Sequence, residues 1–218
     1  MRTYTTSVMV ILISLILASC RTTNRARSCD ELGVQTMRIL IEKHAITDDV
    51  NGNNISQLFG IAPEEVRLEQ GDRYMEWRWQ SDNSSYRLYS EDGQWRIATV
   101  TFDAAQPSAH DLIDCVGDPE WYVAGYGPWG ENQALNFEMY FPTQGLMARS
   151  SDLNERKKPR ITENTLVDEL ALTPPGSIAA MISFLHYDAA DVGEIALQRL
   201  KPWPGNWEDL EFVKPASQ

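Results

Sequence analysis

The sequence predicts an α+β fold of two tandem helix-then-antiparallel-meander units packed as one body. Three observations predict it. Strand-like alternation recurs after each of two short amphipathic segments. Each of these segments ends at a glycine, and a proline stands two or three residues further on. Turn-forming residues separate the strands that follow. An N-terminal helix is expected before the first unit, and a strand-helix extension is expected at the C-terminal end of the second.

The first 19 residues read as a signal peptide that is removed and takes no part in the fold. Arg2 opens the segment, an apolar run over residues 8–17 follows, and the small residues Ala18 and Ser19 precede Cys20. The ending Leu-Ala-Ser-Cys resembles the lipobox of bacterial lipoproteins, which implies that Cys20 is lipidated and becomes the new N-terminus. A membrane-spanning helix needs about 20 apolar residues, more than this run supplies. An uncleaved anchor and cleaved soluble secretion remain the alternatives.

Residues 20–28 are expected to form the lipidated cysteine and a polar tether. At about 3.3–3.6 Å per residue, this tether would hold the body within roughly 30 Å of the bilayer. The predicted location is therefore the extracytoplasmic face of a cell membrane, with the lipid bilayer as a partner through acylated Cys20.

The chain has three cysteines, and lipidation of Cys20 leaves the pair Cys29 and Cys115. In an exported protein such a pair is a candidate disulfide. The alternative is two buried thiols that pack as small apolar residues.

The first α+β unit is expected over residues 29–107. Ser28 and Glu31 fit a capping box at the start of a helix over residues 29–45. A short helical turn at 55–59 ends at Gly60 and Pro63. Alternating or β-branched residues then predict strands at 73–80, 86–90 and 95–102, and the Asp92-Gly93 pair between the last two predicts a hairpin.

The second α+β unit is expected over residues 108–213, before a tail at 214–218. Ser108 can cap a short helix that Gly117 and Pro119 end. Strands are expected at 121–126, 134–141 and 146–149, followed by a charged loop at 150–176 that is either a solvated excursion or functional. The extension is predicted as a central strand at 178–187 and a helix at 191–200, with Ile195 and Leu200 facing inward.

The short helix ending at Gly117 and Pro119, with the three strands that follow it, resembles the BamE (SmpA/OmlA) lipoproteins. Residues 53–150 are also similar to the tandem units of the β-lactamase inhibitor protein. This resemblance implies an envelope protein that binds other proteins and carries no catalytic residues. The repeat itself is faint, and either duplication or generic α+β architecture explains it.

Composition narrows the function classes. The formal net charge of −12 argues against nucleic acid, whose phosphates favour lysine and arginine. The three histidines, His44, His110 and His186, have no second ligand at metal spacing, and no nucleophile or phosphate-loop motif is present. We therefore expect no catalytic residue, no metal and no cofactor.

Aromatic residues in predicted loops and strand ends are the remaining candidates for binding. They would anchor a protein partner or stack on a sugar; the alternative is that they close the ends of the sheet core. The sequence thus predicts a non-catalytic module that binds a protein of the cell envelope, with glycan or solute binding as the second hypothesis. The candidate binding aromatics are Trp121, Tyr122, Tyr126, Trp129, Trp203 and Trp207.

Overall fold

The computed structural model describes residues 64–67, 74–81, 84–92, 94–104, 106–129, 132–152, 161–186 and 190–212. The predicted signal peptide, Cys20, the tether and the helices expected at 29–45 and 55–59 lie outside these residues.

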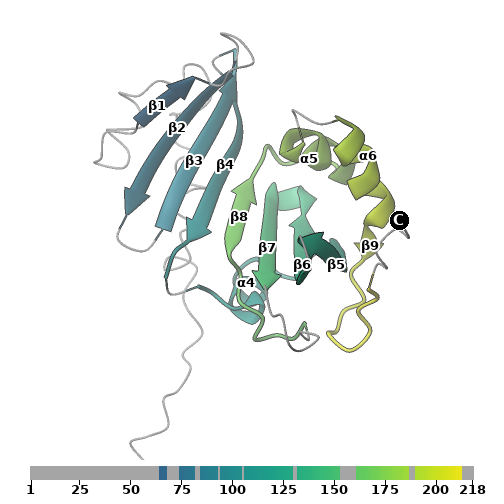
Figure 1. Cartoon of the computed structure of the whole chain (residues 1–218). Helices are drawn as coiled ribbons and strands as arrows, with labels where there is room; N and C mark the ends of the chain where they lie inside the picture. The colour runs from purple at the N-terminus through teal and green to yellow at the C-terminus, as the bar shows by residue number, and fades with distance from the viewer. Residues whose placement is uncertain are drawn as a thin grey trace, which may run out of the picture.

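One nine-stranded sheet, in which every pairing is antiparallel, forms the framework of the described part of the chain. Its strand order is β1-β2-β3-β4-β8-β7-β6-β5-β9 (Figure 1). The strands are β1 Glu64–Arg67, β2 Tyr74–Ser81, β3 Ser84–Glu91, β4 Gln94–Phe102, β5 Trp121–Trp129, β6 Asn132–Phe141, β7 Leu146–Asp152, β8 Glu169–Leu172 and β9 Lys201–Pro202.

Local sequence accounts for the hairpins. The β3–β4 pair turns at Asp92, whose φ of 51° lies in the left-handed region that Asp tolerates in a tight turn. In β6, Phe137, Met139 and Phe141 alternate with polar residues, so one face of the strand is apolar. The predicted hairpin at Asp92 and the predicted strand at 134–141 are both confirmed.

The predicted architecture of two helix-then-meander units packed as one body is wrong. The strands of both predicted units belong to one continuous sheet, because β8 pairs with β4 on one side and with β7 on the other. β8 comes from the segment predicted as the charged loop at 150–176. Its four residues, Glu-Leu-Ala-Leu, are too few to give a readable period, yet three of them are buried.

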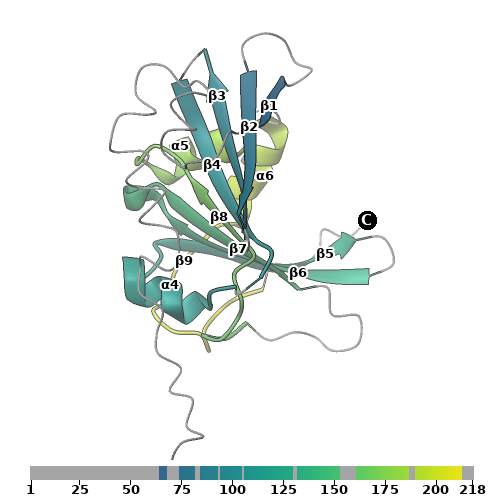
Figure 2. The same ribbon diagram turned by 90° about the vertical axis from the view of Figure 1, so that its left-hand side faces the viewer.

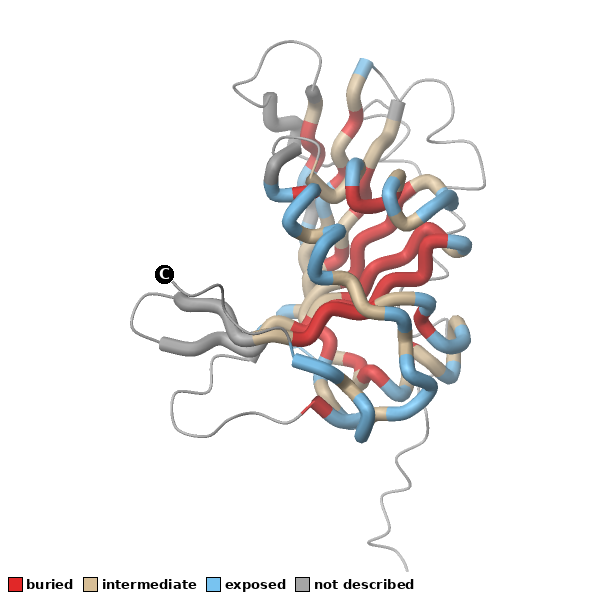
Figure 3. Tube along the Cα trace, turned by 90° about the vertical axis from the view of Figure 1, so that its right-hand side faces the viewer, coloured by how far each residue is buried: buried red, intermediate tan, exposed pale blue. Residues whose placement is uncertain are grey.

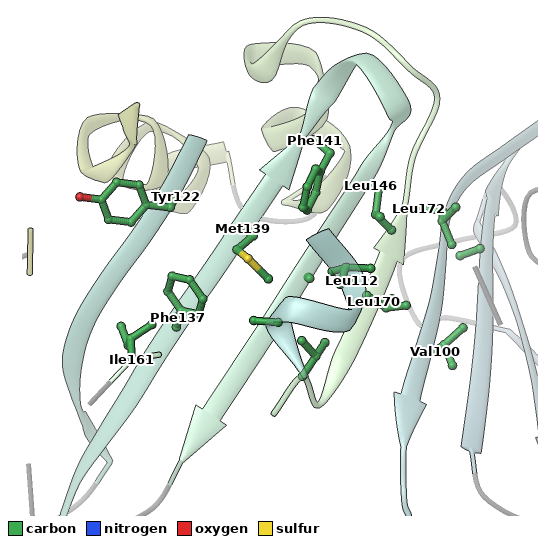
Figure 4. Close-up of a cluster of buried hydrophobic side chains, with 14 of the residues drawn as sticks. Val100, Leu112, Tyr122, Phe137, Met139, Phe141, Leu146, Ile161, Leu170 and Leu172 are labelled. Atoms are coloured by element: carbon green, nitrogen blue, oxygen red, sulfur yellow. The ribbon is translucent and has the colours of Figure 1, made fainter. Parts of the chain in front are cut away.

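Helix α4 (Ala109–Val116) covers one face of the sheet. Ser108 caps its start as expected, and it also forms a capping box with Asp111; Gly117, with a φ of 88°, follows the end of the helix. Leu112 of α4 lies over the buried side chains of β6, β7 and β8 (Figure 4). This face holds the larger core cluster.

Helices α5 (Ile178–Leu185) and α6 (Ala190–Arg199) cover part of the opposite face. Met181 and Ile182 of α5 pack on Val123, Tyr140 and Met147 of the sheet. The molecule therefore has three layers over this half of the sheet, with the buried positions concentrated on its strands (Figure 3).

The predicted strand at 178–187 is also wrong, because a helix occupies these positions, whereas the helix predicted at 191–200 is confirmed as α6. An apolar run of eight residues fits a buried helix as well as a buried strand, and Ser177 decides for the helix by accepting a hydrogen bond from the Ala180 N–H. In α6, Gly193 packs against α5, whereas Ile195, expected to face inward, is 47% exposed. Among the described helices, none combines the length and apolarity needed to cross a membrane.

Candidate interaction edge of strand β5

The two lateral edges of the sheet differ in charge. β1 is four residues long and three of them are charged (Glu, Glu, Arg). At the other side, β5 carries no charged residue over nine positions. Charged side chains on an edge strand oppose pairing with another chain, so β1 is protected and β5 is not.

Among the described strands, β9 alone lies on the outer side of β5, and it covers the first two residues of β5. β9 pairs with Trp121 and Tyr122 and goes no further. From Val123 to Trp129, no strand within the described ranges pairs with the outer edge of β5. Figure 2 shows that this part of the β5–β6 hairpin extends away from the body of the molecule.

The hydrogen-bond pattern identifies which backbone groups face outward. The Thr173 N–H donates to the Gly145 carbonyl at 2.8 Å, and backbone groups alternate in direction along each strand. Carried through the registers of β8, β7 and β6, this alternation points the backbone N–H and C=O groups of Ala124 and Tyr126 to the outer side of β5. Pro128 adds a carbonyl there but no N–H. We call the outer side of residues 123–129 the β5 edge.

The root of the hairpin is fixed by the C-terminal segment at 203–212. The Trp203 N–H donates to the Glu120 carbonyl at 3.1 Å, and the Glu211 N–H donates to the Tyr122 hydroxyl at 2.8 Å. The ring of Trp203 meets Tyr122 and Trp207 edge-on, with centroid distances of 5.9 and 5.1 Å. These contacts give the β5 edge a rigid base.

A charged network lies beside the hairpin on the α5 face of the sheet. The Glu138 carboxylate accepts hydrogen bonds from Arg149 Nε at 3.1 Å, from Asn136 Nδ2 at 3.2 Å and from the Tyr140 hydroxyl. The Nη1 atom of Arg149 also lies 3.6 Å from Oε1 of Glu169, which forms a second ion pair. The network joins β6, β7 and β8 across their ladders.

Burial and charge together favour the protonated forms of Tyr140 and Arg149 in this network. Desolvation, followed by the Glu138 charge, raises the pKa of Tyr140 well above its usual value, so the hydroxyl stays a donor. The pKa of Arg149 is raised as well, because the attraction of Glu138 and Glu169 outweighs the opposing effect of burial. The network is therefore suited to hold the strands together.

The predicted binding aromatics divide into three groups. Tyr122 is 2% exposed and belongs to the core. Trp203 and Trp207 are half-buried and pack on that core, and Trp121 is half-buried in the cluster that includes α5. Tyr126 and Trp129 lie on the β5 edge, but their side chains are outside the described set. For the first two groups, the arrangement fits the alternative that the rings close the ends of the sheet.

The cysteines are only partly described. Cys115, in α4, is disulfide-bonded. Cys20 and Cys29 lie outside the described residues, so the Cys29–Cys115 pairing and lipidation at Cys20 stay predictions. Where side chains are described, no group of three or more His, Cys, Asp or Glu residues is arranged to hold a metal ion.

The sequence alone does not predict that the β5 edge is a candidate interaction site. One signal was available, since residues 121–129 form a strand-like stretch without a single charge. That this strand lies at the side of the sheet depends on β9 and on the long-range β4–β8 pairing, which local patterns do not contain.

Comparison with known proteins gives the chain no family. No protein-family model matches it, and no curated protein matches it. Among solved structures it is similar to a cysteine-rich secretory protein from Staphylococcus aureus subsp. aureus Mu50, at 10% identity and a TM-score of 0.31 over 58% of this chain. That match spans 44% of the staphylococcal chain, and a likeness this low supports no conclusion about fold or activity.

Proposed function

We propose that this protein is a non-catalytic protein-binding module of the cell envelope, moored by acylated Cys20 and using the β5 edge to hold its partner. The observation that carries the proposal is the contrast between the two edges of one sheet. β1 is short and charged, whereas β5 is long, uncharged and uncovered by described strands beyond Tyr122.

The outer side of a strand that pairs with no further strand presents backbone N–H and C=O groups that can bind another chain. Its outward N–H and C=O groups lose hydrogen bonds to water when a partner arrives, and an extended segment replaces them one for one. Ala124 and Tyr126 supply both kinds of group at a spacing that a strand matches. Pro128 would end the donor row, which limits the edge to a short segment.

The predicted tether supports the same function. A lipid at Cys20 and a short polar linker would keep the body close to the bilayer while leaving its surfaces free. The net charge of −12 opposes adhesion of the folded body to an anionic leaflet.

Photo-crosslinking in living cells tests the proposal. A benzoylphenylalanine residue replaces Trp129 on the β5 edge or, as the matched control, Val66 on the β1 edge. We expect a discrete protein adduct from position 129 that is absent from position 66. Tyr126→Pro, which removes an outward N–H, should abolish the adduct, and Tyr126→Phe should keep it. Adducts with lipid only, or the same adducts at both edges, would contradict the proposal.

A further inference from the structure

Two glycines occupy consecutive positions on one face of β5. Gly125 and Gly127 are two residues apart, so both lie on the face that Val123 shares with α5. Across the ladder, Gly125 pairs with Asn136 and Gly127 pairs with Ala134. Between Val123 and Trp129, this face of β5 therefore carries no side chain.

Glycines in a strand weaken it. Each destabilises the strand relative to alanine, and neither supplies a side chain for cross-strand contact. A strand that pairs from the other side can compensate by laying a large side chain over each glycine, as aromatic residues do for edge glycines.

The backbone geometry of the β5 edge makes these positions favourable for such contact. Because Ala124 and Tyr126 point their backbone groups outward, they would form the hydrogen-bonded pairs with an added strand. Gly125 and Gly127 would then form the non-hydrogen-bonded pairs, where the Cα atoms approach to about 4.5 Å and side chains lie closest.

We propose that the β5 edge accepts an extended segment of a partner protein, antiparallel to β5, with a large aromatic or β-branched side chain opposite each of Gly125 and Gly127. This inference rests on the proposed function and specifies the partner's chemistry. The antiparallel direction follows β9, which occupies the same side of β5, and every other pairing in the sheet.

A second copy of this chain fits the β5 edge less well. Two β5 edges, each limited to residues 123–129, have no antiparallel register that puts a large residue opposite both glycines, because one glycine always faces another glycine or the end of the edge. The net charge of −12 on each copy also opposes pairing. The occupant is therefore a different chain.

A displayed library of random nonapeptides, selected on the full mature chain in detergent micelles, tests the inference. We expect enriched peptides to carry large aromatic or β-branched residues at two positions spaced i, i+2. Their affinity should fall at least tenfold with Gly125→Val/Gly127→Val, which fills both positions, and with Tyr126→Pro. Gly176→Ala, in a loop far along the chain with ordinary contact distances, is the matched control and should bind as the parent does.

Several outcomes would overturn it. Enriched peptides without the i, i+2 pattern, peptides that bind the filled variant equally, or a library that yields no binder to the folded parent would each refute the partner's chemistry. Dimers in sedimentation that Gly125→Val/Gly127→Val abolishes would assign the edge to a second copy. If a crosslink from position 129 to a different protein persists in any of these cases, the proposed function stands and only the inference fails.

Discussion

Arg149 on β7 lies directly opposite Glu138 on β6, and its Nε donates to Oε1 of that carboxylate at 3.1 Å. The Glu138 side chain is 11% exposed, whereas that of Arg149 is 38% exposed. The ion pair thus joins a buried acid to a cation that reaches solvent, next to the hairpin that carries the β5 edge.

Removing the cation should cost more than removing the pair. Arg149→Leu leaves the Glu138 charge buried with only neutral donors, and we expect a loss of about 2–3 kcal/mol in the free energy of unfolding, less than for a fully buried pair because Arg149 is partly solvated. The double variant Arg149→Leu/Glu138→Leu should be less destabilised than the single one. Urea unfolding measures both, and a single variant as stable as the parent would contradict the assignment.

Tyr140 makes stability sensitive to alkaline pH. Its pKa in the folded protein is raised well above the usual tyrosine value of about 10, which applies when the chain is unfolded. As the pH rises through 10, the unfolded state gains by releasing the proton while the folded state holds it, so stability falls with rising pH. Tyr140→Phe should be less stable than the parent at pH 7, by about 1 kcal/mol for the lost hydrogen bond, and should show a shallower decline between pH 9 and 11 in urea midpoints. Parallel declines for both proteins would exclude Tyr140 as the cause.

Gly145 should not tolerate a side chain. Its φ of 65° is left-handed, and a Cβ atom there would lie 2.2 Å from the Thr173 carbonyl oxygen. Gly145→Ala should therefore lower stability by about 3 kcal/mol or more through backbone displacement and strain. Gly176→Ala, whose nearest atom would be 3.7 Å away, should change it by no more than about 0.5 kcal/mol. Equal thermal midpoints for the two variants would mean that the close approach is not present in solution.

Local sequence patterns predicted individual turns, strands and helix caps of this fold, but they did not predict strand β8, which joins the two halves of the sheet. The Asp92 turn, the alternation in β6 and the Ser108 cap are short-range features, and each forms as expected. β8 has only four residues, and it is stabilised by pairing with β4 and β7, which are not its neighbours in the sequence. Its own sequence therefore shows no alternation from which a strand could be predicted. The β5 edge depends on that same long-range order, which is why the uncharged strand was visible in the sequence while its exposure to a partner was not.

The two tryptophans of the C-terminal segment should act in folding and not in sugar binding. Trp207 lies 6.1 Å from Phe137 and 5.1 Å from Trp203, ring to ring. Trp207→Ala should cost about 2–3 kcal/mol, below the loss for a fully buried ring because Trp207 is half-buried. Val192→Ala, on the exposed side of α6, should cost no more than about 0.5 kcal/mol. Titration of the parent with cell-wall fragments should leave tryptophan fluorescence unchanged, and a saturable change would revive the glycan hypothesis.

Attachment to the membrane should depend on one sulfur atom. If Cys20 carries the lipid, Cys20→Ser should move the protein from the membrane fraction to the soluble extracytoplasmic fraction and abolish incorporation of a clickable fatty acid, because acyl chains supply about 0.8 kcal/mol per buried CH₂. Cys29→Ser is the matched control and should keep both the label and the membrane location, even if it exposes a thiol on Cys115. Label retained in Cys20→Ser, or an intact Met1 in the mass spectrum of the purified protein, would place the anchor elsewhere and leave the β5 edge without its predicted position near the bilayer.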